Sequence, residues 1–175
     1  MVSIGVTGHR DLDNVKLITS SVDEVLRKIR NTFPGETLTI ISPLAEGADR
    51  LVVWRAMENN DVHLVVLLPL EISDYMLDFE SIYSKAEFVT LLEQAAQVIE
   101  LPAEETRETS FLAAGSYILD HSELLIAVWD GQPARGPGGT GQIVAQAREK
   151  LMPIAWVFSG DPDPHPQSKA GKTPG

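Results

Sequence analysis

The stretch from Leu124 to Lys150 constrains the fold more than any other part of the chain. It begins with six apolar residues, Leu124–Trp129, whose length and composition predict a strand that is buried on both faces. A loop rich in Gly and Pro follows Asp130, and apolar residues then recur at helical spacing from Thr140 onward. A helix that starts in such a loop exposes backbone N–H groups at the positive end of its dipole. The stretch therefore predicts an anion site, most often a phosphate site.

The candidate phosphate-binding residues are Gly138, Gly139, Thr140 and Gly141. A tight turn from strand to helix would explain some of these glycines, but three within four residues exceed what a turn needs. The run Gly136–Gly141 also fits G-x-G-x-x-G formally. It lies late in the chain and several residues past its strand, whereas the dinucleotide fingerprint follows the first strand directly. We therefore expect no nicotinamide or flavin, and no cofactor.

Strands alternate with helices along the rest of the chain. Strands are predicted at Val2–Val6, Leu38–Ile41, Val62–Leu68, Val98–Leu101 and Pro153–Phe158, and helices at 15–29, 48–58, 82–96 and 110–121. Because several strands are wholly apolar, this order predicts an α/β fold, a Rossmann-like three-layer sandwich with a mainly parallel central sheet.

The length of 175 residues predicts one domain, residues 1–159, followed by a disordered tail, residues 160–175, that is rich in Pro and Gly. Between Glu71 and Ser81 we expect a long loop that serves as a lid or binding loop. The three tryptophans are predicted core residues, namely Trp54, Trp129 and Trp156.

Polar loops leave the carboxyl ends of three predicted strands, where ligands bind in parallel sheets. The first contributes Thr7, Gly8, His9 and Arg10, which we expect to contact a phosphate or a ribose. The second and third contribute the candidate ligand residues Glu46, Gly47 and Asp130. We expect Glu46 or Asp130 at the sugar, although Asp130 suits an Asx turn equally well. Glu46 and Asp49 with Arg50 are candidates for a polar rim of the site, but capping of the second helix is the commoner use of an Asp at position 49 and is the preferred interpretation.

Composition excludes several classes of partner. The net charge of −11 argues against a nucleic-acid surface. The chain has no cysteine and its four histidines are scattered, so we expect no metal site. No apolar run is long enough to span a bilayer and no signal peptide is recognisable, so we expect no membrane association and a cytoplasmic location. The expected partner is a small nucleotide-like molecule. The sequence leaves open whether the chain also forms a homo-oligomer.

Together the three loops resemble the SLOG superfamily of Rossmann-like nucleotide-binding domains. The resemblance spans about Val2 to Phe158 and rests on Thr-Gly-His-Arg at 7–10, Ala-Glu-Gly-Ala-Asp-Arg at 45–50 and Gly-Gly-Thr-Gly at 138–141. That group includes the Lonely Guy phosphoribohydrolases, the DprA and YpsA-like proteins and the ligand-sensing domain of TRPM channels. The resemblance implies binding or sensing of a nucleotide or an ADP-ribose-like ligand.

Enzymatic activity is left open by the same resemblance. The phosphoribohydrolase signature is Gly-Gly-x-Gly-Thr-x-x-Glu. When its glycines are aligned with Gly138, Gly139 and Gly141, Gln142 occupies the position of its threonine and Ala145 that of its catalytic glutamate. The glycines are present and the catalytic carboxylate is missing. The alternative function is hydrolysis of an N-glycosidic bond, for which Glu46 is the candidate catalytic carboxylate. A domain that only binds a protein partner is a third reading.

Overall fold

The computed structural model describes residues 1–58, 62–134 and 136–160. The predicted tail, apart from Gly160, therefore lies outside the described residues. The strands are β1 (Val2–Gly8), β2 (Leu38–Ser42), β3 (Val62–Leu68), β4 (Gln97–Glu100), β5 (Leu124–Trp129) and β6 (Ile154–Phe158). The helices are α1 (Val15–Thr32), α2 (Ala48–Glu58), α3 (Ile72–Tyr75), α4 (Ile82–Glu93), α5 (Arg107–Asp120) and α6 (Thr140–Glu149), with a 3₁₀ turn, η1 (Met76–Asp78).

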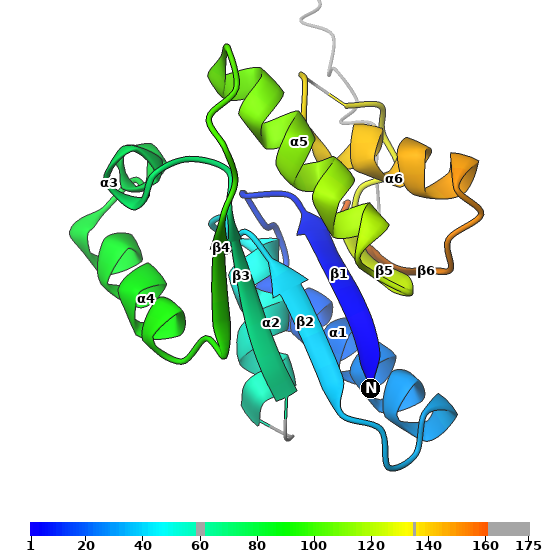
Figure 1. Cartoon of the computed structure of the whole chain (residues 1–175). Helices are drawn as coiled ribbons and strands as arrows, with labels where there is room; N and C mark the ends of the chain where they lie inside the picture. The colour runs from blue at the N-terminus through cyan, green and yellow to red at the C-terminus, as the bar shows by residue number, and fades with distance from the viewer. Residues whose placement is uncertain (59–61, 135, 161–175) are drawn as a thin grey trace, which may run out of the picture.

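The six strands form one sheet in the order β4-β3-β2-β1-β5-β6, and every neighbouring pair is parallel (Figure 1). The chain moves outward from β1 to β4, returns through α5, and resumes at β5 on the other side of β1. The order of strands therefore reverses between β1 and β5. In parallel sheets ligands bind outside the carboxyl ends of the strands at such a point.

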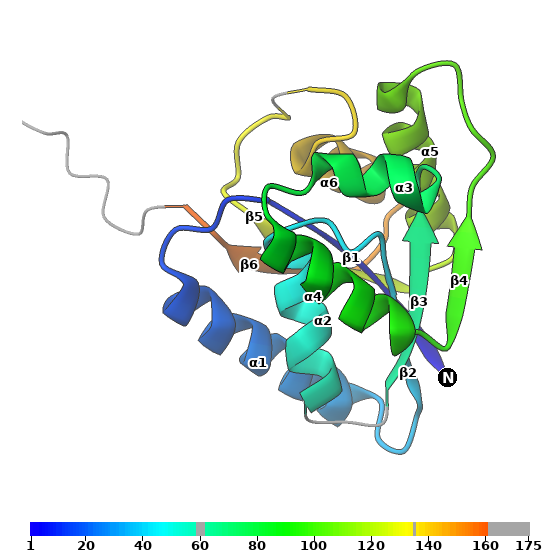
Figure 2. The ribbon, with the colours of Figure 1, turned by 90° about the vertical axis from the view of Figure 1, so that its left-hand side faces the viewer.

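Helices cover both faces of the sheet, which confirms the predicted α/β, Rossmann-like fold. Figure 2 shows α1, α2 and α4 on one side, and α5 on the other. Alternation along each strand explains the two layers, because successive side chains point to opposite faces. Ile4, Ile40 and Val66 pack in the core under α1, α2 and α4, whereas Ile41, Leu67 and Leu125 pack under α5 and α6.

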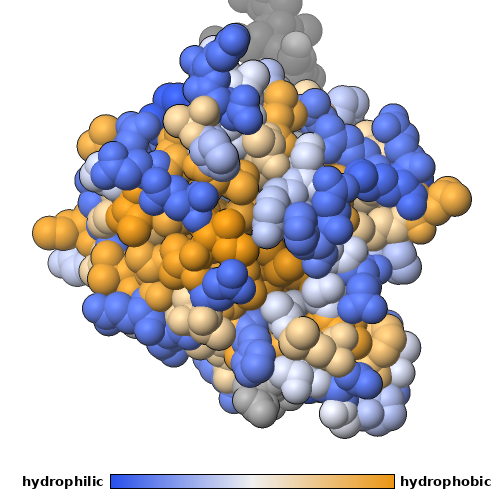
Figure 3. All heavy atoms as spheres, viewed as in Figure 1, coloured by the Kyte–Doolittle hydropathy of each residue, from blue (hydrophilic) through white to orange (hydrophobic). Residues whose placement is uncertain are grey.

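The second layer covers the sheet incompletely. Figure 3 shows apolar surface in the middle of the face that Figure 1 presents, next to α5, where strands have no helix in front of them. Val65, Ile99 and Leu101 are partly buried side chains that pack against the core on this side. Among the described residues, no helix has the length and apolar composition needed to cross a bilayer.

Three sequence-based expectations about the fold are wrong. The segment 71–81 is not an open loop but contains α3 and η1, because its aromatic residues Tyr75 and Phe79 are buried. The Tyr75 ring packs edge to face against the rings of Phe79 and Phe88. Helix α5 begins at Arg107, three residues earlier than expected, because Thr106 and Thr109 form a capping box. Trp156 is 51% exposed, because it lies on the edge strand β6.

Candidate functional site

A cavity of about 390 Å³ lies at the carboxyl ends of β1 and β5, where the strand order reverses. Its walls come from the loop after β1, the loop after β2, the middle of α5 and the glycine loop before α6. Eight of the eleven candidate ligand residues line it, namely Thr7, Gly8, His9, Arg10, Gly138, Gly139, Thr140 and Gly141. Glu46, Gly47 and Asp130 lie outside its lining.

The glycine loop turns the N-terminus of α6 toward the cavity. Gly139 is the N-cap residue, and no side chain caps this helix end. Two loop amides already have acceptors: Gly138 N donates to Gln142 Oε1 at 2.9 Å, and Gly139 N donates to Gly136 O at 3.2 Å. The amides of Thr140 and Gly141 have no acceptor among the described residues. These two donors, with the positive end of the α6 dipole, are suited to an anion.

Gly138 and Gly141 are required by the loop itself. Gly138 has a φ of 74°, which favours glycine. A Cβ atom at Gly141 would lie 2.6 Å from Ala134 N and 2.8 Å from Gln132 O, so the helix start packs directly on the loop backbone. The glycines therefore hold the turn as well as exposing amides.

Arg10 brings a positive charge to the opening of the cavity. Its side chain is exposed, and none of the ion pairs among the described residues includes it. His9 is held in place, because its Nε2 atom lies 3.0 Å from Asp130 Oδ1. Asp130 also accepts from Gln132 N at 3.0 Å and thus forms the Asx turn that the sequence allowed. Asp130 orients His9 from outside the cavity.

Gly47 positions the loop after β1. Its φ is 80°, and a Cβ atom there would lie 2.0 Å from Arg10 O. The next residue, Ala48, donates its backbone N–H to His9 O at 3.0 Å. The start of α2 is therefore packed against the backbone of His9 and Arg10. Gly47 acts on the site through this contact and does not face the cavity.

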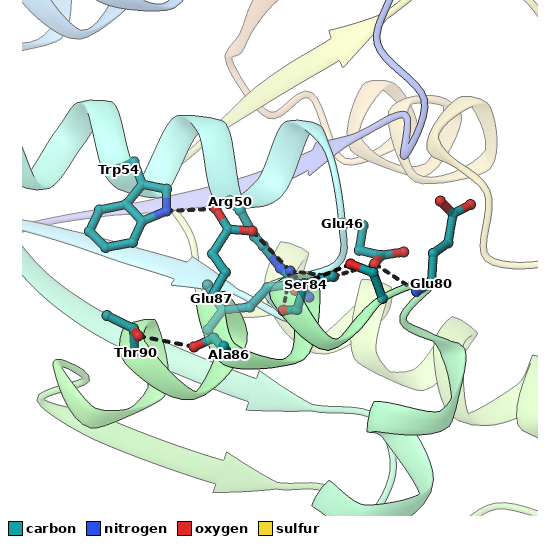
Figure 4. Close-up of polar contacts among 10 residues, drawn as sticks. Glu46, Arg50, Trp54, Glu80, Ser84, Ala86, Glu87 and Thr90 are labelled. Atoms are coloured by element: carbon teal, nitrogen blue, oxygen red, sulfur yellow. Dashed lines mark hydrogen bonds and ion pairs between the residues drawn. The ribbon is translucent and has the colours of Figure 1, made fainter.

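Glu46 points away from the cavity, toward α4 (Figure 4). It accepts from Glu80 N at 3.0 Å and from the Ser84 hydroxyl. Beside it, Arg50 donates to Ser84 O at 2.8 Å and to Glu87 Oε2 at 3.0 Å. These contacts line a second, polar hollow of about 300 Å³, which shares Arg10 with the cavity, and they fasten α4 to α2. The candidate catalytic carboxylate thus anchors the beginning of α4.

Ala145 lies on the exposed side of α6 and does not line the cavity. The resemblance puts a catalytic glutamate at this position. In this chain a carboxylate at position 145 would project from the outer face of the helix. Substitution of Ala145 by Glu therefore would not place an acid or base in the cavity.

Asp49 is the one acidic residue that lines the cavity among the described residues, and sequence reasoning assigned it to capping. It is the second residue of α2 and only 3% exposed. Burial raises its pKa to about 7, although a hydrogen bond with the Ala45 backbone and the charges of Arg10 and Arg50 act in the opposite direction. Nothing local in the sequence signals this burial.

Tyr75 and α5 complete the walls. Tyr75 is 1% exposed, and burial raises the pKa of its phenol well above the usual range. From α5, Phe111, Ala114 and Ile118 supply an apolar surface. A mostly apolar wall that faces a few polar groups is typical of small-molecule sites. Sequence reasoning treated α5 only as a helix of the fold.

No protein-family model matches the chain, and no curated protein matches its sequence. Among solved structures, the X-ray structure of TM1055 is 13% identical and covers 91% of this chain and 94% of its own, with a TM-score of 0.49. Two structures of the Moco carrier protein from Chlamydomonas reinhardtii are 17% and 20% identical. They cover 92% of this chain and 77% and 78% of their own, each with a TM-score of 0.49. Similarity at this level assigns neither a ligand nor an activity to the chain.

Proposed function

We propose that this protein binds or senses a small anionic ligand, a nucleoside phosphate or an ADP-ribose-like molecule, in the cavity at the ends of β1 and β5. The observation that carries the proposal is the uncapped N-terminus of α6, whose Thr140 and Gly141 amides have no acceptor among the described residues. Arg10 adds a cation without an ion-pair partner in the described chain. The apolar wall of α5 suits a base or a sugar ring.

The volume of the cavity supports a ligand of this class. At about 390 Å³ the cavity lies in the range of small-molecule sites. Its polar groups are backbone amides and the side chains of Thr7, His9, Arg10, Asp49, Tyr75 and Thr140. Backbone amides at a helix N-terminus bind phosphate through fixed donors and the helix dipole, so phosphate seating needs no particular side chain in the glycine loop.

Binding is favoured over hydrolysis by the positions of two residues. Glu46 contacts α4 outside the cavity, and Ala145 stands on the exposed side of α6. The hydrolase alternative keeps one supporting observation, the buried carboxyl of Asp49 in the cavity wall. Chromatography of each nucleotide after prolonged incubation tests this alternative. Release of free base that disappears in an Asp49→Asn variant would establish hydrolysis in place of binding alone.

The test of the binding proposal is calorimetry with AMP, ADP and ADP-ribose, with adenosine as the control ligand that lacks phosphate. We expect affinity for the phosphorylated ligands and much weaker binding of adenosine. Equal affinity for AMP and adenosine, or binding of none of them, would contradict the proposal.

Gly139→Asp tests the location of the phosphate. The N-cap position prefers Asp, so the variant should keep its melting temperature or gain stability. Its carboxylate would occupy the amides of α6 and repel a phosphate, so we expect the affinity to fall at least roughly 100-fold, as expected for two like charges a few ångströms apart at a partly buried site. Gly139→Ala is the matched control, because it adds the same Cβ atom, 3.1 Å from Gly136 O, without a charge. Unchanged affinity in folded Gly139→Asp would remove the phosphate from this loop.

A further inference from the structure

The cavity joins elements from both faces of the sheet, and Asp49 lies on the side opposite the glycine loop. The glycine loop leads into α6, whose apolar residues pack with those of α5 on one face of the sheet. Asp49 belongs to α2, whose apolar residues pack on the other face. A ligand with its phosphate on the α6 amides therefore extends across the carboxyl edge of the sheet toward Asp49.

The carboxyl group of Asp49 has no compensating ion pair. None of the ion pairs among the described residues includes it. The neighbouring Arg50 makes its hydrogen bonds elsewhere, because its Nε donates to Leu44 O at 2.9 Å and its Nη1 donates to Ser84 and Glu87. Its buried Nη2 has no hydrogen-bond partner among the described residues, and no ion pair joins Arg50 to Asp49. A buried carboxylate without a salt bridge is costly, whereas the protonated acid can both donate and accept hydrogen bonds.

We propose that Asp49 is the ligand-contacting, specificity-determining residue at the α2 end of the cavity, and that as the protonated acid it binds a neutral hydrogen-bonding group of the ligand, a sugar hydroxyl or a base amide. This inference rests on the proposed nucleotide-binding function. Its consequence is that the cavity takes up its anion and a proton together. An ionised Asp49 would repel the phosphate and attract Arg10, and both effects weaken binding of an anion.

The charged and titratable groups around Asp49 determine in which direction the affinity changes with pH. Arg10 and His9 come from the loop after β1, Arg50 from α2 and Tyr75 from α3, and Asp78 in turn acts on Tyr75. The described residues of α5 and the glycine loop that line the cavity carry no charge. Since the pKa of Asp49 in the free protein is about 7, affinity for an anion should fall as the pH rises above 7.

The first experiment is calorimetry with ADP-ribose, whose pyrophosphate has no monoester group that titrates near pH 6. We expect the Kd of the unchanged protein to rise up to about tenfold per pH unit above roughly pH 7.5. In the same pH range, binding should take up close to one proton, which is measured by comparing the binding enthalpy in buffers of different ionisation enthalpy. Asp49→Asn should remove this dependence, so that its own Kd values at about pH 6 and pH 8.5 differ by less than about threefold. Asp49→Ala should bind at least about tenfold more weakly at pH 6, because it lacks the hydrogen bond.

A second measurement needs no variant, so it stands whether or not Asp49→Asn and Asp49→Ala fold. Titration of the unchanged protein by carboxyl ¹³C NMR should show one aspartate with a midpoint near 7, and ADP-ribose should raise that midpoint. A pH slope shared by the unchanged protein and Asp49→Asn would belong to a group other than Asp49 and would overturn the inference while nucleotide binding stands. So would the absence of any aspartate that titrates near neutral pH. Failure of all phosphorylated ligands to bind would overturn the proposed function and this inference with it.

Discussion

At the scale of single residues, the cavity is decided by which polar side chains are buried and which are turned outward. Three carboxylates follow the carboxyl ends of β2 and β5: Glu46, Asp49 and Asp130. Glu46 contacts the start of α4, Asp130 contacts His9, and Asp49 lines the cavity. All three have the same chemistry, and only their burial and partners distinguish their roles.

Asp49 should make stability depend on pH. Its pKa is raised from 3.8 to about 7 in the folded protein, so the folded state holds a proton that the unfolded state releases. Between these two values, stability therefore falls as the pH rises, and the loss is complete above the folded pKa. We expect the melting temperature of Asp49→Asn, relative to that of the unchanged protein, to rise by roughly 3 °C or more between pH 5 and pH 8.

The control for this comparison is Asp11→Asn, which changes an exposed carboxylate by the same atoms. Melting followed by circular dichroism from pH 5 to pH 8 measures all three proteins. A constant difference between Asp49→Asn and the unchanged protein across this range would show that Asp49 keeps the same charge in both states.

At the scale of elements, α4 is fastened to α2 by polar contacts at its start and an apolar face behind them. Arg50 and Glu46 of the α2 region hold Ser84, and Glu87 accepts from both Arg50 and Trp54 (Figure 4). Phe88 and Leu91 bury the inner face of α4 in the core. The guanidinium of Arg50 also lies 4.4 Å from the Phe79 ring centroid. Glu46 thus belongs to the packing of α4.

Glu46→Gln should therefore loosen α4 without weakening ligand binding. The amide keeps the shape but loses the charge that accepts from Ser84 and Glu80 N, and such a charged hydrogen bond contributes roughly 1 kcal/mol when partly exposed. We expect faster hydrogen exchange in the first turns of α4 and an unchanged Kd for ADP-ribose. Glu93→Gln, at the exposed end of α4, is the control. A loss of affinity in Glu46→Gln alone would return Glu46 to the ligand site.

At the scale of the whole molecule, one parallel sheet positions the helices and the loops that the structure describes. The central strands β1 and β5 are flanked on both sides, and their apolar residues are almost completely buried. The carboxyl end of β1 and the loop that follows β5 line the cavity. Residues 161–175 lie outside the described chain and carry no large apolar side chain.

Truncation after Ser159 should leave the domain intact. A segment without large apolar residues can bury little surface, so its removal should shift the melting temperature by no more than about 1–2 °C. Calorimetric melting of the truncated chain beside the full chain measures this shift, and binding of ADP-ribose to both provides the functional control. A fall of many degrees would mean that residues 160–175 pack on the domain.

The order of strands and helices could be predicted from the sequence because apolar runs and helical periodicity are local properties. The same reasoning predicted that Thr7–Arg10 and Gly138–Gly141 lie together, since parallel strands end at one edge. The packing of segment 71–81, the outward direction of Ala145 and the burial of Asp49 depend on contacts between distant elements. Glu46 and Asp49 are three residues apart in one motif, yet one contacts α4 and the other lines the cavity. Tertiary packing alone decides this difference, because it determines which of the two carboxyl groups is buried and loses its hydration.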